Sequence, residues 1–216
     1  MKNHKLLIAT GNKGKFQEIS SLLGDYQFSC ISASDYNLEE PIEDGNDFAQ
    51  NSLIKAKYYG NKTNLLALAD DSGLCVDVLD GDPGIHSARW AVDDSTGKRD
   101  FNLAFARIAQ KLQEKAIDLQ NDKITAYFIC NLTIFNPINN KYKSFEGRVD
   151  GVLTFPARGD KGFGYDPIFI SKIFEDKTFA QIDPSKKESI SHRTEAFKKF
   201  SSFFGSADFA DLLNNN

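Results

Sequence analysis

Four short segments of this chain carry side chains that could together bind a phosphorylated ligand. They are T-G-N-K-G-K at 10–15, D-D-S-G at 70–73, G-F-G-Y-D-P at 162–167 and S-H-R at 191–193. The first offers backbone donors and lysines, the second paired carboxylates, the third a glycine-rich aromatic turn, and the fourth ring and guanidinium donors. Because phosphate, a metal ion and a base each need a different one of these chemistries, the set predicts a nucleoside triphosphate site.

The first segment follows the apolar run 5–10 and precedes a helical pattern. The N–H groups that begin a helix bind phosphate, and Thr10 and Asn12 can add hydrogen bonds to it. Lys13 or Lys15 can add a full positive charge. The G-x-x-x-x-G-K-[ST] spacing of a Walker A loop is missing, so an ordinary strand-turn-helix connection with surface lysines is the alternative.

The second segment places Asp70 and Asp71 side by side, and we expect them in a turn between two strands. Two adjacent carboxylates need water, cations or donors, and Mg²⁺ shared with phosphate oxygens would satisfy them. Glu43 is a further candidate ligand. The alternative is a solvated acidic turn in which Ser72 serves as a cap.

Aromatic and cationic side chains for a base come from the two remaining segments. Phe163 or Tyr165 could stack on a base, although both rings could instead belong to the core. Lys187, His192 and Arg193 lie near the start of the last expected helix. Since no Ser/His/Asp or H-E-x-x-H spacing is present, we interpret these three as ligand contacts and not as a nucleophile system.

Composition limits the class of protein. A chain of 216 residues with a net charge of −4 gives no general electrostatic reason to bind nucleic acid. The three cysteines are far apart and predict neither a disulfide framework nor a zinc site. We find no signal peptide and no apolar run long enough to cross a membrane, so we expect a soluble cytoplasmic protein without a membrane partner.

Hydrophobic periodicity predicts an α/β fold with a mixed sheet and some hairpins. Helices are expected at 15–23, 47–59, 101–115 and 189–204, with Asn46 or Asp47 capping the second. Strands are expected at 5–10, 65–69, 74–79, 126–135, 141–153 and 168–170.

The order of these motifs resembles the inosine triphosphate pyrophosphatase family nearly from end to end. The blocks that carry the resemblance are T-G-N-x-x-K-x-x-E from Thr10, N-x-x-x-K-A from Asn51, A-D-D-S-G-L from Ala69, P-G-I-x-S-A-R from Pro83, G-F-G-Y-D-P-I-F from Gly162, and Lys187 with S-H-R from Ser191. The chain departs from the family at Gln50, Ser52 and Lys161, none of which is assigned to the chemistry.

The resemblance implies an elongated mixed sheet flanked by helices, in two lobes with an active-site cleft between them. It implies one domain over residues 1–210 with a frayed tail at 211–216, and a homodimer. The implied reaction is hydrolysis of dITP, ITP and XTP to the monophosphate and pyrophosphate, with Mg²⁺ held by Asp71 and Glu43 and with Asp71 as proton acceptor.

The substrate contacts implied by the resemblance fall into two groups. The phosphate side comprises Thr10, Gly11, Asn12, Lys13, Gly14, Lys15, Lys55 and Ser72, and the base side comprises Phe163, Gly164, Tyr165, Asp166, Lys187, His192 and Arg193. Three alternatives stay open at this point: a metal-activated water as the effective base, Asp70 as the second metal ligand, and a different function. The different function would be a pyrophosphatase for modified pyrimidine or methylated nucleotides, or a nucleotide sensor without turnover.

Overall fold

The computed structural model describes residues 4–24, 26, 28–174 and 176–214. The chain divides into two compact units. The first comprises Met1–Asp71, Cys130–Gly147 and Arg193–Asn216, and the second comprises Ser72–Ile129 and Arg148–His192.

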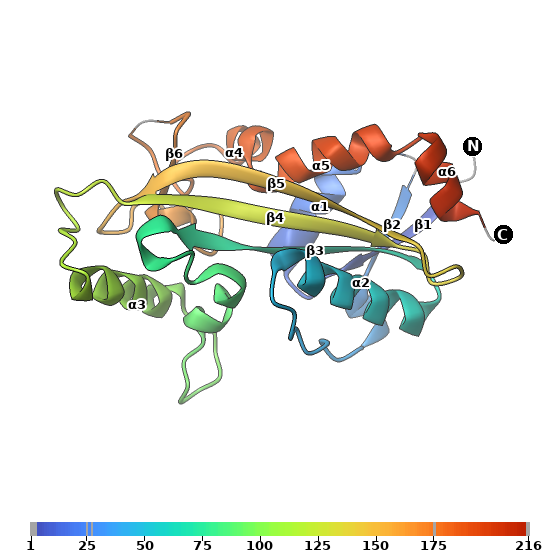
Figure 1. The fold of residues 1–216 in the computed structure, drawn as a ribbon, viewed down its shortest axis with the longest axis horizontal. Coiled ribbons are helices and arrows are strands. Elements are labelled where there is room, and N and C mark those ends of the chain that lie inside the picture. The colour runs from blue at the N-terminus through green and yellow to red at the C-terminus, as the bar shows by residue number, and fades with distance from the viewer. Residues whose placement is uncertain (1–3, 25, 27, 175, 215–216) are drawn as a thin grey trace. The chain divides into compact units, whose positions relative to one another are not determined.

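A six-stranded sheet runs in the order β2-β1-β3-β4-β5-β6 (Figure 1). Its strands are β1 (His4–Ala9), β2 (Phe28–Ser32), β3 (Leu66–Val76), β4 (Thr125–Phe135), β5 (Tyr142–Leu153) and β6 (Phe169–Ser171). The pairs β1/β2 and β1/β3 are parallel, whereas β5/β6 is antiparallel. The predicted α/β fold with a mixed sheet is therefore confirmed. Strand β2 was not predicted, because its F-S-C-I-S sequence lacks a clear apolar alternation.

Six α-helices are present in the described part of the chain: α1 (Lys13–Leu22), α2 (Phe48–Thr63), α3 (Phe101–Glu114), α4 (Pro184–Ile190), α5 (His192–Phe203) and α6 (Ala207–Leu213). Asp47 caps α2 as expected, with its carboxylate accepting from the Gln50 N–H. The single helix expected at 189–204 is instead two helices, because Ser191 has extended backbone (φ −71°, ψ 159°). Helix α6 continues to Leu213 with Leu212 buried, so the tail expected to fray from residue 211 is helical over that stretch.

The core of the first unit follows from the period of two along β1. Leu6 and Ile8 pack in a cluster with side chains of α1, α5 and α6, whereas Leu7 and Ala9 pack in a cluster with side chains of α2. Figure 1 shows α2 and α5 on opposite sides of β3 and β4. Both faces of β1 are thus covered, as its apolar run at 6–9 indicates.

Strand β3 alternates in the same way and corrects one prediction. Leu68 joins the α1/α5 cluster, while Ala67 and Ala69 join the α2 cluster. The strand then continues through Asp70 and Asp71, so the expected turn between two separate strands is wrong. Since consecutive side chains of a strand point to opposite faces, the two aspartates are directed to different helices.

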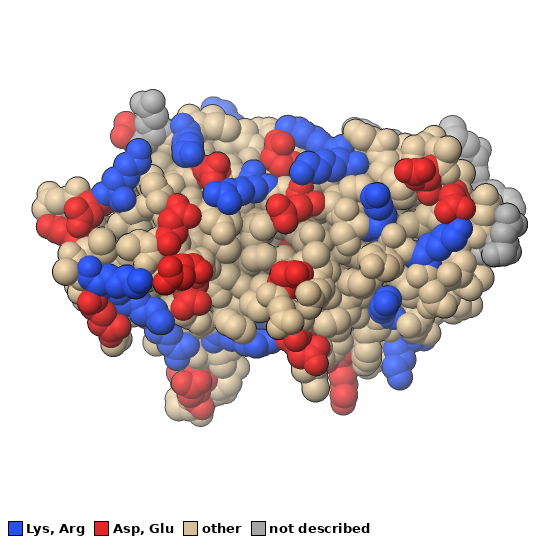
Figure 2. All heavy atoms as spheres, viewed as in Figure 1, with Lys and Arg blue, Asp and Glu red and all other residues tan. Residues whose placement is uncertain are grey.

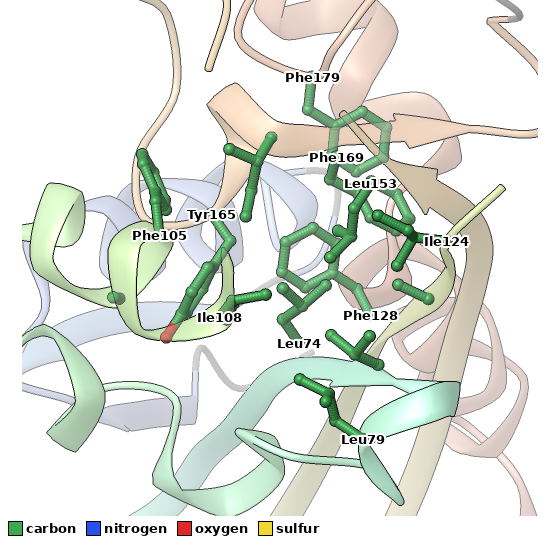
Figure 3. Packing of buried hydrophobic residues seen from close by; sticks show 14 of the residues in the cluster. Leu74, Leu79, Phe105, Ile108, Ile124, Phe128, Leu153, Tyr165, Phe169 and Phe179 are labelled. Atoms are coloured by element: carbon green, nitrogen blue, oxygen red, sulfur yellow. The ribbon is translucent and has the colours of Figure 1, made fainter. Parts of the chain in front are cut away.

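The core of the second unit is rich in aromatic rings, among them Phe105, Phe128, Phe169 and Phe179 (Figure 3). Phe128 of β4 contacts Phe169 of β6 edge to face, with ring centroids 4.6 Å apart. Phe169 in turn contacts Phe179 at 5.0 Å. Ile108 of α3 lies in the same cluster and is fully buried. These contacts hold the segment that follows β5 against the end of the sheet.

Two surface properties bear on partners. Within residues 4–24, 26, 28–174 and 176–214, no helix has both the length and the apolar character needed to cross a membrane. On the face seen in Figure 2, lysine and arginine side chains are interspersed with aspartate and glutamate and form no large patch of one sign.

Candidate active site

The turn between β1 and α1 is held in shape by Asn12. Its Oδ1 accepts the N–H groups of Gly14 (2.9 Å) and Lys15 (3.2 Å), while its own N–H donates to Thr10 Oγ1 at 3.1 Å. Asn12 is therefore the N-cap of α1, and the first helical turn is preorganised before any ligand binds. A Cβ at Gly11 would meet only the carboxylate end of the exposed Glu40 side chain, which can move aside.

Asp70 is the centre of a buried cluster on the α1/α5 face. Its Oδ1 lies 2.5 Å from Lys15 Nζ, and its Oδ2 accepts from Arg193 Nε at 2.8 Å and from the Cys130 thiol at 3.0 Å. Arg193 also bonds Glu18 of α1. Burial disfavours the charged carboxylate, but Arg193 and Lys15 outweigh it and hold the pKa of Asp70 well below its usual range. Asp70 is therefore an ionised anchor for two cations.

Asp71 meets a different set of groups on the α2 face. Its Oδ1 accepts from Lys55 Nζ at 2.9 Å, and the same ammonium group lies 3.1 Å from Glu43 Oε2. Its Oδ2 is buried without a hydrogen-bond partner. Burial raises the pKa of Asp71 despite the attraction of Lys55. Asp71 therefore has one oxygen paired with Lys55 and one buried oxygen without a hydrogen-bond partner.

The donor set around Asp71 fits a hard cation. Glu43 and Asp71 converge on one ammonium group, and a buried carboxylate oxygen without a partner is the kind of atom that a cation satisfies. In the part of the chain that the structure describes, no cluster of three or more His, Cys, Asp or Glu could hold a metal ion. A metal here would take its remaining ligands from water and phosphate, as Mg²⁺ does and as structural zinc does not.

In the second unit, Asp166 organises the G-F-G-Y-D-P turn. Its Oδ2 accepts the N–H of Phe163 at 2.9 Å and the ammonium group of Lys187 at 2.6 Å. Lys187 Nζ also lies 4.6 Å from the centroid of the Phe163 ring, within cation–π distance. Gly162 has φ +72°, and a side chain there would collide with Asp166. The Phe163 ring and the Lys187 ammonium group are thus fixed next to each other.

Tyr165 has a structural role in the same turn. Its ring is 3% exposed, packs against Phe101 at 5.2 Å and lies within the aromatic core (Figure 3). Its hydroxyl donates to Ser87 O at 2.8 Å, and Ser87 Oγ accepts the N–H of Leu74 at 3.0 Å. Of the two rings predicted as stacking partners, Phe163 is therefore the half-buried one and Tyr165 is core.

The remaining predicted residues are distributed as follows. His192 is buried, and its ring stacks on Phe128 at 4.8 Å. Ser72 is half-buried in β3, and Lys13 is exposed in the first turn of α1. Arg193, expected at the edge of a base, is 1% exposed with its guanidinium group bonded to Asp70 and Glu18.

Two residues of the Asp70 cluster were not assigned a role from the sequence. Glu18 lies three residues after Lys15, on the same side of α1, so the T-G-N-x-x-K-x-x-E block contained this signal. Cys130 had no signal, because a cysteine in an apolar strand normally indicates only burial.

Comparison with known proteins shows the family to which this chain belongs. Residues 6–203 match the Ham1 family. The chain belongs to this family. It is 44% identical over 195 residues to a protein of Zymomonas mobilis named dITP/XTP pyrophosphatase, a match that covers 90% of this chain and 89% of that protein. It is 46% identical over 195 residues to a protein of the same name from Caulobacter vibrioides, covering 90% and 95%.

A solved structure supports the fold. The HAM1 protein from Coxiella burnetii superposes with a TM-score of 0.80 at 31% identity, covering 93% of this chain and 98% of that protein. The resemblance drawn from the sequence motifs is therefore confirmed.

Proposed function

We propose that this protein hydrolyses the non-standard purine nucleoside triphosphates dITP, ITP and XTP to the monophosphate and pyrophosphate. The observation that carries the proposal is the setting of Asp71, whose Oδ1 accepts from Lys55 and whose buried Oδ2 has no partner. A carboxylate with a raised pKa and one oxygen in reserve suits proton transfer from water. The names of the relatives at 44% and 46% identity support the same reaction.

Cationic groups of the first unit would receive the triphosphate. Lys15 and Lys55 now pair with Asp70 and Asp71, and both ammonium groups can also donate to phosphate oxygens. Thr10 and Asn12, at the turn before α1, would fix the position of the phosphates near the helix N-terminus. These contacts would hold the α-phosphorus in position for attack by water, and such positioning lowers the entropic cost of the reaction.

Asp71 would act as the proton acceptor, with Oδ2 as the receiving atom. Asp71 and Glu43 are also the residues that would hold Mg²⁺. When bound, the ion neutralises charge on the phosphate oxygens and on the pyrophosphate leaving group. Asp70 would take no part in either step, because both of its oxygens are bonded to cations or a thiol.

Selection of the base would come from the second unit. Phe163 supplies a ring for stacking, and Lys187, fixed by Asp166, supplies an ammonium donor beside it. A 6-oxo purine presents an acceptor where adenine presents an amino group. A fixed donor therefore disfavours ATP by about 1–3 kcal/mol for each buried group left unpaired.

His192 and Arg193 remain predicted base contacts. A cytoplasmic location and a homodimer also remain predictions.

The test is product analysis with Mg²⁺ and each of ITP, XTP, dITP, ATP and GTP. We expect IMP and pyrophosphate from ITP, with ATP much slower. Formation of IDP and phosphate would contradict the reaction assigned to this site. Tight binding of ITP without turnover would indicate a nucleotide sensor, and faster turnover of a modified pyrimidine or methylated nucleotide would indicate the related pyrophosphatases.

A further inference from the structure

The segment that carries Glu43 is fastened to α2 at two points. The Glu43 carboxylate contacts Lys55, and the Gly45 N–H donates to Asn51 Oδ1 at 2.9 Å. Asn51 and Lys55 are four residues apart on α2 and so lie on one face of the helix. Residues 37–47 have no helix or strand of their own, and near Glu43 these two contacts fasten the segment to α2.

The contact at Gly45 is closely fitted. Asn51 is 1% exposed, and a Cβ at Gly45 would lie 2.7 Å from Asn51 Oδ1 and 2.7 Å from the Cβ of Gln50. The chain can approach α2 this closely only because residue 45 is glycine. Asn51 Nδ2 is buried without a hydrogen-bond partner, so the bond to Gly45 is the amide's one described polar contact.

The hydrogen bond from Gly45 to Asn51 acts as a tether for Glu43, because Glu43 and Gly45 are only two positions apart. Two residues span at most about 7 Å, so fixing Gly45 confines the backbone of Glu43 to the vicinity of Lys55. The Glu43 side chain is 31% exposed and would otherwise lose rotamer freedom on binding a cation. A tether that restricts it beforehand lowers that cost.

We propose that Asn51 is a positioning residue for Glu43: by accepting the Gly45 N–H, it holds the segment 39–46 so that Glu43 and Asp71 are ready to bind a divalent cation together. The inference rests on the proposed function in one respect, since it takes Glu43 as a metal ligand. It adds a residue that touches neither the nucleotide nor the metal.

The experiment compares Asn51→Ala with Gln50→Ala. Gln50 is a matched control, because its Oε1 accepts the next N–H along, that of Asn46, at 3.0 Å, but at an exposed position. Two readouts besides activity are used: hydrogen exchange of the Gly45 amide, and Mn²⁺ binding to the nucleotide-free protein followed by electron paramagnetic resonance. Loss of one buried hydrogen bond corresponds to about a fivefold change in an equilibrium constant. We expect Asn51→Ala to speed hydrogen exchange of the Gly45 amide and to weaken Mn²⁺ binding, each by about that factor. Gln50→Ala should stay close to wild type in both measurements.

Two further variants guard against a general loss of folding. Asn51→Asp keeps an oxygen that can accept from Gly45 and should recover the protection of that amide. Gly45→Ala keeps Asn51 but forces the segment away, and should weaken Mn²⁺ binding as Asn51→Ala does. Unchanged exchange and Mn²⁺ affinity in a folded Asn51→Ala protein would overturn the inference.

The proposed function fails separately from the tether. If wild type does not bind Mn²⁺, or binds it as well after Glu43→Gln, then the metal assignment fails. If wild type does bind through Glu43 and Asn51→Ala binds equally well, then only the role of Asn51 fails.

Discussion

Asp70 and Asp71 are neighbours in β3, yet their carboxylates pair with cations from opposite faces of the sheet. Asp70 meets Lys15 and Arg193, whereas Asp71 meets Lys55. The alternation of side chains along a strand thus separates two acids that the sequence presents as a pair. Both oxygens of Asp70 are bonded to other side chains, whereas Oδ2 of Asp71 is buried without a hydrogen-bond partner.

Replacing Asp71 by asparagine should remove activity and leave folding nearly intact. The swap is almost isosteric, and Lys55 keeps Glu43 as a carboxylate partner. Burial also raises the pKa of Asp71, so its charge stabilises the fold less than the charge of Asp70 does. We expect kcat/KM for ITP to fall more than tenfold, about 1.4 kcal/mol, while the free energy of unfolding changes by less than about 1 kcal/mol. Retention of more than a tenth of wild-type kcat/KM would show that another group is the key carboxylate.

Asp70→Asn should behave in the opposite way and lose stability. Removing this charge takes a buried carboxylate away from both Arg193 and Lys15, and breaking a buried ion pair costs about 3–5 kcal/mol. Urea unfolding at pH 7 measures the loss. A stability within about 1 kcal/mol of wild type would mean that the Asp70 cluster contributes little to the fold.

The pH dependence of that loss has a defined sign. Because the folded-state pKa of Asp70 is depressed, its stabilisation is complete above the unfolded value of about 3.9 and disappears as pH falls through the folded value. The difference in stability between wild type and Asp70→Asn should therefore be largest at about pH 5 to 7 and should shrink below about pH 4. Urea titrations across this range check it, and a difference that grew on acidification would contradict the cluster as described.

The sequence predicted elements better than it predicted partners. Helices α1, α2 and α3 were found because apolar spacing and N-cap residues such as Asp47 agree. The turn expected at 70–73 was wrong because aspartate, serine and glycine are usual turn residues and are rare inside strands. Here the strand tolerates the charge of Asp70 because Lys15 and Arg193, distant in the chain, compensate it.

The sequence also predicted the residues of the candidate site better than it predicted which of their side chains contact one another. Residue types identified the chemistry, since lysines, carboxylates and a glycine-rich aromatic turn are informative wherever they lie. Which side chain pairs with which depends on strand alternation and helix placement, and Tyr165 shows the consequence. Its ring was a candidate for base stacking, but its packing against Phe101 and its bond to Ser87 make it part of the core.

The three cysteines should differ in reactivity as their burial differs. Cys30 is half-buried, whereas Cys75 and Cys130 are buried. Burial, together with the neighbouring Asp70 carboxylate, raises the pKa of Cys130 well above its usual range, so its reactive thiolate is scarce at pH 8. We expect a thiol-specific disulfide reagent to modify Cys30 first, and all three only after unfolding in guanidinium chloride. Rapid modification of Cys130 in the native protein, identified by peptide mass, would show that the Asp70 cluster opens readily.

Arg193 distinguishes a role in the fold from a role in base selection. The sequence motif predicts a base contact, but the guanidinium group is buried against Asp70 and Glu18. If these ion pairs are its main function, then Arg193→Ala should cost about 3–5 kcal/mol of stability, because it leaves Asp70 without its strongest partner. It should then lower kcat/KM for ITP and for ATP by the same factor.

Lys187→Met is the comparison for base selection. Lys187 is the donor held beside Phe163, so its loss should lower kcat/KM for ITP by more than it does for ATP. Both nucleotides must be measured with both variants, at a temperature where each variant is folded. A selective loss for ITP in Arg193→Ala would place Arg193 in the base pocket as the motif predicts, and equal losses in Lys187→Met would remove Lys187 from it.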